Sequence, residues 1–306
     1  MKENHVVVIG SLNYDVFLRV GAMPKVGETC PAEGMAVSGG GKGANQAVQC
    51  AKLGLRTYMA GAVGNDAMGD FLLSGLREYG VDTSCIRRSD AGSGFSPVHV
   101  MPGGKVFGTI YHGANFDISP ADVDHLMPLV QDAFALMLQL EIPTETVCYA
   151  IRRAHAAGTP VILNAAPASP LPEDVLGLCH TFMANEVEAS FYTGTVIETP
   201  QQAMDAIRPF CARHGIRAIF TLGAQGAAAC DGGQARLIPP VPAQAVESTG
   251  AGDSFAGGFV KALHAGRDFF SAASFAAACG AVTVSKVGCQ NSMPFLSEMV
   301  TILEKL

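Results

Sequence analysis

Runs of apolar residues about as long as a β-strand alternate with amphipathic helical patterns along most of this 306-residue chain. The strand-like runs lie at residues 5–9, 57–63, 135–140, 160–163, 181–183 and 218–222, and the helical patterns at residues 66–79, 144–157, 186–192 and 200–214. Such alternation builds a mostly parallel sheet, because each parallel crossover needs a helix that packs back on the sheet. We therefore expect a doubly wound α/β fold with helices on both faces.

Two stretches interrupt this alternation, and no helical pattern follows either of them. The first pairs residues 16–20 with residues 29–37, and the second is a hairpin of residues 95–101 and 106–111 around a turn at residues 102–105. We expect both to form a small separate sheet, inserted at about residues 14–37 and 94–112 of a single domain that spans residues 1–306. Ligands of doubly wound folds bind at the carboxyl ends of the strands, where such a sheet can act as a lid.

Charge and cysteine content exclude several classes of function. The formal net charge is −7 and there is no run of Lys or Arg, so neither nucleic acid nor a membrane is an expected partner. The nine cysteines are scattered and include no C-x-x-C pair, which is typical of reduced thiols. No segment has the length of a signal-peptide core or of a membrane span. We expect a soluble, cytoplasmic protein.

Residues 249–255, with the sequence TGAGDSF, place an aspartate at the glycine-rich start of a helical pattern. The glycines allow backbone amides to converge on one point, and a helix N-terminus favours negative charge there. A carboxylate beside such an anion-binding site, here Asp253, can accept the proton of an attacking hydroxyl while the amides hold a transferred phosphate. Taken alone, the same string is also compatible with an ordinary helix cap.

A second glycine-rich segment, residues 39–45 with the sequence GGGKGAN, also opens a helical pattern. Lys42 and Asn45 are three residues apart and share a face in its first turn. Upstream, Asn13 and Asp15 follow the first strand and point the same way if the chain stays extended. A lysine, two carboxamides and a carboxylate supply donors and acceptors for a polyhydroxylated ligand, which favours a sugar.

Together the two segments resemble the signatures of the ribokinase branch of the PfkB family of carbohydrate kinases, and the similarity runs from the first strand to the final helix. The family has one glycine-rich segment near its N-terminus and a second, ending in its catalytic aspartate, near its C-terminus. The resemblance implies a ribokinase-like fold. It also implies an ATP-dependent kinase that transfers the γ-phosphoryl group to the primary hydroxyl of ribose or a closely related pentose.

The resemblance further implies roles for individual residues. Asp253 matches the family's general base, and the backbone amides of Gly250, Ala251 and Gly252 match its anion-binding site. The positions implied for the sugar are Asn13, Asp15, Gly41, Lys42, Asn45, Ile110, Glu141 and Asp253. The positions implied for ATP and its Mg²⁺ are Asn185, Glu188, Thr221, Gly223, Gly226 and Gly252.

An activating monovalent cation, K⁺, is implied at Glu247, Thr249, Thr283, Lys286, Gly288 and Ser292, mostly through backbone carbonyls. Ribokinases usually have an aspartate where this chain has Glu247. Glutamate is one methylene longer, so its carboxylate is expected to reach beyond the usual cation position or to shift the ion. Ala277 stands where a larger polar residue near the adenine is expected, which leaves base selectivity open. The lid sheets of this family often pair, so we expect a homodimer.

Other functions remain open on the sequence alone. Residues 39–44 fit a loose dinucleotide fingerprint, but that fingerprint should directly follow the first strand, which disfavours a nicotinamide-dependent oxidoreductase. A kinase for another sugar such as 2-deoxyribose, or a non-catalytic protein that senses a sugar or nucleotide, would carry the same motifs. Among the eight histidines only His112, beside the expected lid strand, is a candidate for lining the sugar pocket.

Overall fold

The computed structural model describes residues 5–102 and 106–303, the last three by their backbone alone. Its main sheet has nine strands in the order β13-β12-β11-β10-β9-β8-β1-β4-β5. Their bounds are β1 His5–Ile9, β4 Arg56–Gly64, β5 Asp82–Ser89, β8 Ala135–Leu138, β9 Val161–Asn164, β10 Thr181–Asn185, β11 Arg217–Thr221, β12 Ala227–Asp231 and β13 Gln234–Ile238. The strands from β5 to β11 pair in parallel, and only β12 and β13 pair antiparallel. The expected doubly wound sheet is confirmed.

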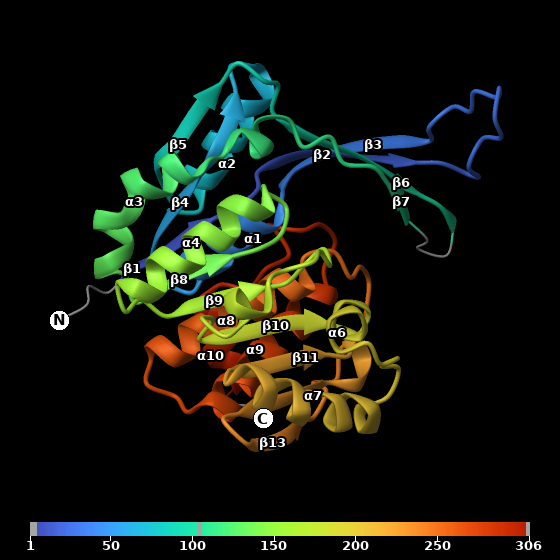
Figure 1. The fold of residues 1–306 in the computed structure, drawn as a ribbon. Coiled ribbons are helices and arrows are strands. Elements are labelled where there is room, and N and C mark those ends of the chain that lie inside the picture. Colours follow the sequence, from blue (N-terminus) through green and yellow to red (C-terminus); the bar gives the residue numbers. More distant parts are fainter. Residues whose placement is uncertain (1–4, 103–105, 304–306) are drawn as a thin grey trace.

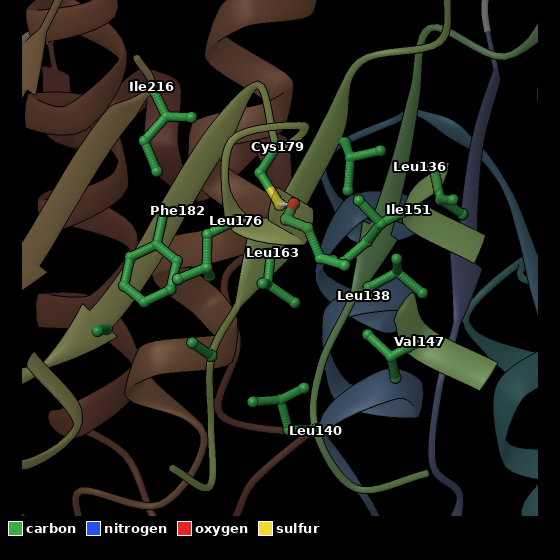
Figure 2. Packing of buried hydrophobic residues seen from close by; sticks show 14 of the residues in the cluster. Leu136, Leu138, Leu140, Val147, Ile151, Leu163, Leu176, Cys179, Phe182 and Ile216 are labelled. Carbon is green, nitrogen blue, oxygen red and sulfur yellow. Dashed lines mark hydrogen bonds between the residues drawn. The ribbon is translucent and has the colours of Figure 1, made fainter. Parts of the chain in front are cut away.

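Helices cover both faces of this sheet. The first face carries α3 Pro120–Asp132, α4 Thr144–Ala156, α5 Glu173–Leu176, α6 Glu186–Thr193 and α7 Pro200–His214, and the second carries α1 Lys42–Lys52, α2 Ala67–Glu78, α8 Ala251–His264, α9 Phe269–Val284 and α10 Leu296–Leu303. Successive strand side chains point to opposite faces, so Val7 and Ile9 of β1 enter the first core while Val6 and Val8 enter the second. Figure 2 shows the first core, where side chains of β8, β9, β10 and α4 meet.

Local signals place the helix ends where the sequence indicates. Ser119 and Asp122 form a capping box in front of α3, with Pro120 as the first helical residue. Gly215 ends α7 in the left-handed conformation, with φ 68°. The least polar helix, α9, packs against α8 and is buried there, and within the described residues no helix combines the length and apolarity needed to cross a membrane.

The two stretches that interrupt the alternation form a second sheet, with strand order β3-β2-β6-β7. Its strands are β2 Asn13–Arg19, β3 Gly34–Gly40, β6 Gly94–Val100 and β7 Val106–Gly108. Figure 1 shows these strands extending away from the rest of the chain, as a lid would. The expected small sheet is therefore confirmed, whereas the tip of its expected turn, residues 103–105, lies outside the described residues.

Candidate active site

The predicted site residues gather where the parallel strands end. Asn13 follows β1, Glu141 follows β8 and Asn185 ends β10, and the carboxyl ends of parallel strands meet at one edge of a sheet. Two helices begin at this same edge: Lys42 is the first residue of α1, and Asp253 lies in the first turn of α8. The topology thus brings together the two glycine-rich segments.

Asp253 is buried at the junction of these helices, with 6% of its surface exposed. Asn45 Nδ2 donates to Asp253 Oδ2 at 2.9 Å, and Gln46 Nε2 donates to Asp253 Oδ1 at 3.0 Å. Burial raises the pKa of Asp253, while the charge of Lys42 and these two amide donors oppose the rise. The result is a carboxylate more basic than usual, as a general base for a hydroxyl requires.

The start of α8 is a glycine-rich helix N-terminus, and its role as an anion-binding site stays a prediction. Gly250 is left-handed with φ 78°, and a Cβ there would lie 2.7 Å from the Cys289 sulfur, so only glycine fits. A Cβ on Gly252 would meet nothing within 4 Å, so this part of the turn faces open space. The Ala251 amide donates to the Ser248 carbonyl at 3.3 Å. The helix N-terminus itself attracts an anion to this open side.

Charged side chains converge beside Asp253. Glu141 Oε2 accepts from the Ser11 hydroxyl at 2.5 Å and from the Lys42 backbone amide at 3.0 Å, which ties α1 to the ends of β1 and β8. Burial lowers the pKa of Lys42, but nearby carboxylates, Asp253 first, raise it more, so the net shift is upward and the ammonium stays charged. Burial, and then the charge of Glu141, raise the pKa of Asp15 to about 7.

The glycines of residues 39–45 have different tasks. Gly40 belongs to β3 rather than to a loop, and a Cβ there would collide with the Asp15 carboxylate, which lies directly over it. Gly41 has φ 86°, and its Cβ would come within 2.8 Å of the Ser11 carbonyl oxygen. These positions let the backbone approach Asp15 and Ser11 closely, which packs the base of the lid against the first strand.

Asn115 is a residue that the sequence reasoning missed. It lies fully buried in the short helix η2 (Gly113–Asp117). Its Oδ1 accepts from the Leu12 amide at 2.8 Å, and its Nδ2 donates to the Leu12 carbonyl at 3.1 Å and to Asn13 Oδ1 at 2.8 Å. Asn115 therefore orients Asn13 at the point where the chain leaves the main sheet for the lid. No local motif marks it, because its partners lie about a hundred positions away in the chain.

On the nucleotide side, Asn185 and Glu188 form a capping box at the start of α6. Asn185 Oδ1 accepts from the amides of Val187 and Glu188, both at 2.9 Å, and Glu188 Oε2 accepts from the Asn185 amide at 2.9 Å. Glu188 is 7% exposed, and burial raises its pKa. The N-x-x-E motif thus has a structural role, and its role toward Mg²⁺ stays a prediction.

The other predicted nucleotide residues lie on one loop. Thr221 ends β11, Gly223 begins the short helix η3 (Gly223–Gln225), and Gly226 follows it with φ 90°. A Cβ on Gly226 would collide with the Ile238 carbonyl, so glycine is required there. Ala277 lies half-buried on α9, packed against the second core.

The predicted cation ligands lie in two segments, residues 247–249 and 283–292. Glu247 Oε2 accepts from the Gly288 amide at 2.9 Å, which connects the two segments directly. Within the described residues no group of three or more His, Cys, Asp or Glu side chains could hold a metal ion. The remaining predicted ligands in these segments are Thr249, Thr283, Lys286 and Ser292.

The last two candidates for the sugar side lie beyond the lid hairpin. Ile110 follows β7 and is 46% exposed, so its contact with a sugar stays a prediction. His112 stacks on Phe116 with 3.9 Å between the ring centroids. That stacking gives His112 a packing role next to η2.

Fold and site together define a doubly wound phosphotransferase, in which a buried carboxylate lies in the first turn of a helix and a small second sheet begins at the same edge of the main sheet. The profile of the pfkB family of carbohydrate kinases matches residues 3–296, and the chain belongs to this family.

Comparison with individual proteins narrows the class. The chain is 34% identical to a ribokinase of Schizosaccharomyces pombe over 96% of both chains, and 32% identical to a deoxyribokinase of Salmonella typhi, again over 96% of both. The solved structure of Arabidopsis thaliana ribokinase complexed with ribose and ATP matches with a TM-score of 0.90 and 32% identity, covering 98% of this chain and 99% of that one. The predicted ribokinase branch and the predicted ATP-dependent carbohydrate kinase are confirmed.

Proposed function

We propose that this kinase phosphorylates D-ribose to ribose 5-phosphate, with ATP as the phosphoryl donor. The observation that carries the proposal is the buried Asp253, held by Asn45 of the sugar motif at the open N-terminus of α8. A carboxylate in that place can receive the proton of a sugar hydroxyl that enters between α1 and the lid. The ribose and ATP bound to the Arabidopsis relative support the choice of substrates.

In this proposal the protein contributes positioning and electrostatics. Asn13, Asp15 and Glu141 hold the hydroxyls of the sugar ring, and Lys42 neutralises charge near the transferred group. The oxygen of the primary hydroxyl of the sugar forms a bond to the γ-phosphorus, and the bond from the γ-phosphorus to the oxygen that leaves with ADP breaks. Asp253 accepts the proton of the hydroxyl in this step. The amides at the start of α8 stabilise the negative charge on the phosphoryl oxygens.

The site also fits the Mg²⁺ that accompanies ATP. Glu188 is a buried carboxylate whose electrostatic neighbours include Lys42 and Asp253, so it lies close to the reacting groups. A cation held there through water would relieve the repulsion among these carboxylates. Bound Mg²⁺ would supply neutralisation of the charge on the phosphates.

A panel of sugars tests the proposed function. Purified protein is incubated with ATP, Mg²⁺ and D-ribose, 2-deoxy-D-ribose, D-xylose or D-fructose, and ADP formation is measured. We expect the highest kcat/KM with D-ribose. A preference for 2-deoxyribose would identify the alternative that the Salmonella relative represents. ATP turnover with none of the sugars, although they bind, would identify a sensing protein instead.

Potassium should activate the enzyme, and Glu247 should set the strength of that activation. Its carboxylate binds the Gly288 amide, which belongs to the same segment as the implied ligands Thr283, Lys286 and Ser292. We expect turnover to fall severalfold when K⁺ is replaced by a bulky organic cation, and Glu247→Asp to strengthen the response to K⁺. Turnover that depends on neither the salt nor the substitution would contradict a cation site here.

The lid should pair two copies of the chain. On one face of the small sheet Met35, Leu18, His99 and Phe107 lie side by side in register, and Met35 and Phe107 are 71% and 51% exposed. Burying the apolar side chains of this row, Met35, Leu18 and Phe107, favours association. Sedimentation at micromolar concentration should show a dimer, and Phe107→Glu should shift it toward monomer. A wild-type monomer in the presence of sugar would count against the dimer.

A further inference from the structure

Four buried carboxamides form a hydrogen-bonded chain through Asp253. Gln46 Nε2 and Asn45 Nδ2 donate to the two oxygens of Asp253, at 3.0 and 2.9 Å. Behind them, Gln139 Nε2 donates to Gln46 Oε1 at 2.7 Å, and Gln290 Nε2 donates to Asn45 Oδ1 at 3.1 Å. None of the four is more than 6% exposed. Each amide that contacts the carboxylate is thus itself contacted by a second amide.

The direction of these bonds matters for the carboxylate. A carboxamide has a donor end and an acceptor end, and the acceptor end turned toward Asp253 would repel it. The bond from Gln139 occupies the oxygen of Gln46, which leaves its Nε2 facing Asp253. In the same way, the bond from Gln290 occupies the oxygen of Asn45 and leaves its Nδ2 facing Asp253. Aligned bonds of this kind also polarise one another in a buried site.

The surrounding charges show why neutral donors are needed. Lys42 from α1 favours the ionised form of Asp253, whereas Glu141 after β8 disfavours it. Glu188 from α6 and the Cys289 thiol after α9 also interact electrostatically with Asp253. Burial disfavours the ionised form further. The amide donors therefore supply stabilisation of the carboxylate that one lysine must otherwise supply alone.

We propose that Gln46, oriented by Gln139, is a positioning residue of the phosphoryl transfer, which keeps Asp253 ionised and turned toward the sugar hydroxyl. The inference rests on the proposed function, because that function makes Asp253 the general base. The sequence places Gln46 directly after the sugar motif, but its partner Gln139 is 93 positions away. Only the fold joins them.

The variant Gln46→Met tests the inference, because it keeps the length of the side chain and removes the donor. We expect kcat/KM for the sugar at neutral pH to fall about tenfold, and the acid limb of its pH profile to move up by about one pH unit, since loss of a donor raises the pKa of the base. The KM for ATP should not change. Gln139→Met should shift the limb in the same direction by less.

Gln49→Met is the matched control. Gln49 lies on the same helix and is equally buried, but it donates to the Pro294 carbonyl at 3.1 Å and accepts from the Ser254 hydroxyl at 2.8 Å. Gln49→Met should lower the Tm to about the same extent as Gln46→Met, but it should not move the acid limb of the pH profile of kcat/KM.

Three outcomes separate the possibilities. A wild-type pH profile in Gln46→Met, or an equal shift in Gln49→Met, would overturn the positioning role. If Gln46→Met does not fold, an unshifted Gln139→Met would overturn it in the same way. A wild-type protein that phosphorylates no sugar would instead overturn the proposed function, a result seen before any variant is made.

Discussion

Asp253→Asn should lower kcat by about 10²–10⁴-fold, because it removes the positioned general base. This loss corresponds to roughly 3–5 kcal/mol of activation free energy. The fold should remain, since the amide has nearly the same shape as the carboxyl group and Asp253 does not cap α8, whose N-cap is Gly250. The NH₂ group of the new asparagine faces a donor, from Gln46 or Asn45, and this contact is unfavourable. The substitution also removes a buried charge, which is favourable and offsets that cost. The change should therefore appear chiefly in kcat, and binding of ATP should hardly weaken.

Steady-state kinetics with saturating sugar and ATP check this result, and thermal unfolding checks the fold. Asp268→Asn is a suitable control, because Asp268 caps α9 through its side chain at an exposed position and asparagine caps equally well. It should leave both kcat and Tm close to wild type. Activity of Asp253→Asn within about threefold of wild type would rule out the base and leave Asp253 a structural residue.

Asp15→Asn should have opposite effects on catalysis and on stability. Asp15 carries one of the charges proposed to hold the sugar, and a hydrogen bond to a charged group contributes roughly 1.5–3 kcal/mol. The KM for ribose should therefore rise about 10- to 100-fold. The sugar-free protein should nevertheless become more stable at alkaline pH, because the ionised carboxylate is unfavourable in the fold.

The sign follows from proton linkage. The pKa of Asp15 is raised from 3.8 to about 7, by burial and then by Glu141, so between these values the folded state binds more protons than the unfolded state. The contribution of Asp15 to wild-type stability should then fall as the pH rises from about 4 to about 7, by up to roughly 4 kcal/mol. Asp15→Asn should lack this contribution, so the difference in stability between the two proteins should change over this pH range. Urea unfolding at several pH values measures it, and identical pH dependence in both proteins would contradict the raised pKa.

Two strands could not be predicted from local sequence pattern. β5, with the sequence DTSCIRRS, is mostly polar, and β12, with the sequence AAACD, is mostly alanine, so neither has the apolar run by which the other strands are found. β5 is a strand because β4 lies beside it, and β12 because β11 and β13 enclose it. Tertiary pairing overrides weak intrinsic strand preference both at the edge of the sheet, as in β5, and inside it, as in β12.

The sequence by itself determined the features that depend on near neighbours in the chain. Alternating strand and helix periods give the doubly wound sheet, and the strand-like stretches that interrupt this alternation give the lid. The two glycine-rich segments give the helix starts that carry Lys42 and Asp253, since glycine conformation and helix caps are local properties.

Only the tertiary structure decided which distant groups meet. It brings Gln139 to Gln46 and Asn115 to Leu12 and Asn13, and these amides leave no trace in local patterns. It also decides the protonation of Asp15, because the same aspartate in an extended chain would keep its ordinary pKa. Burial and long-range hydrogen bonds are set by packing across the whole sheet. This packing positions and orients the residues of the sugar motif, which local sequence cannot do.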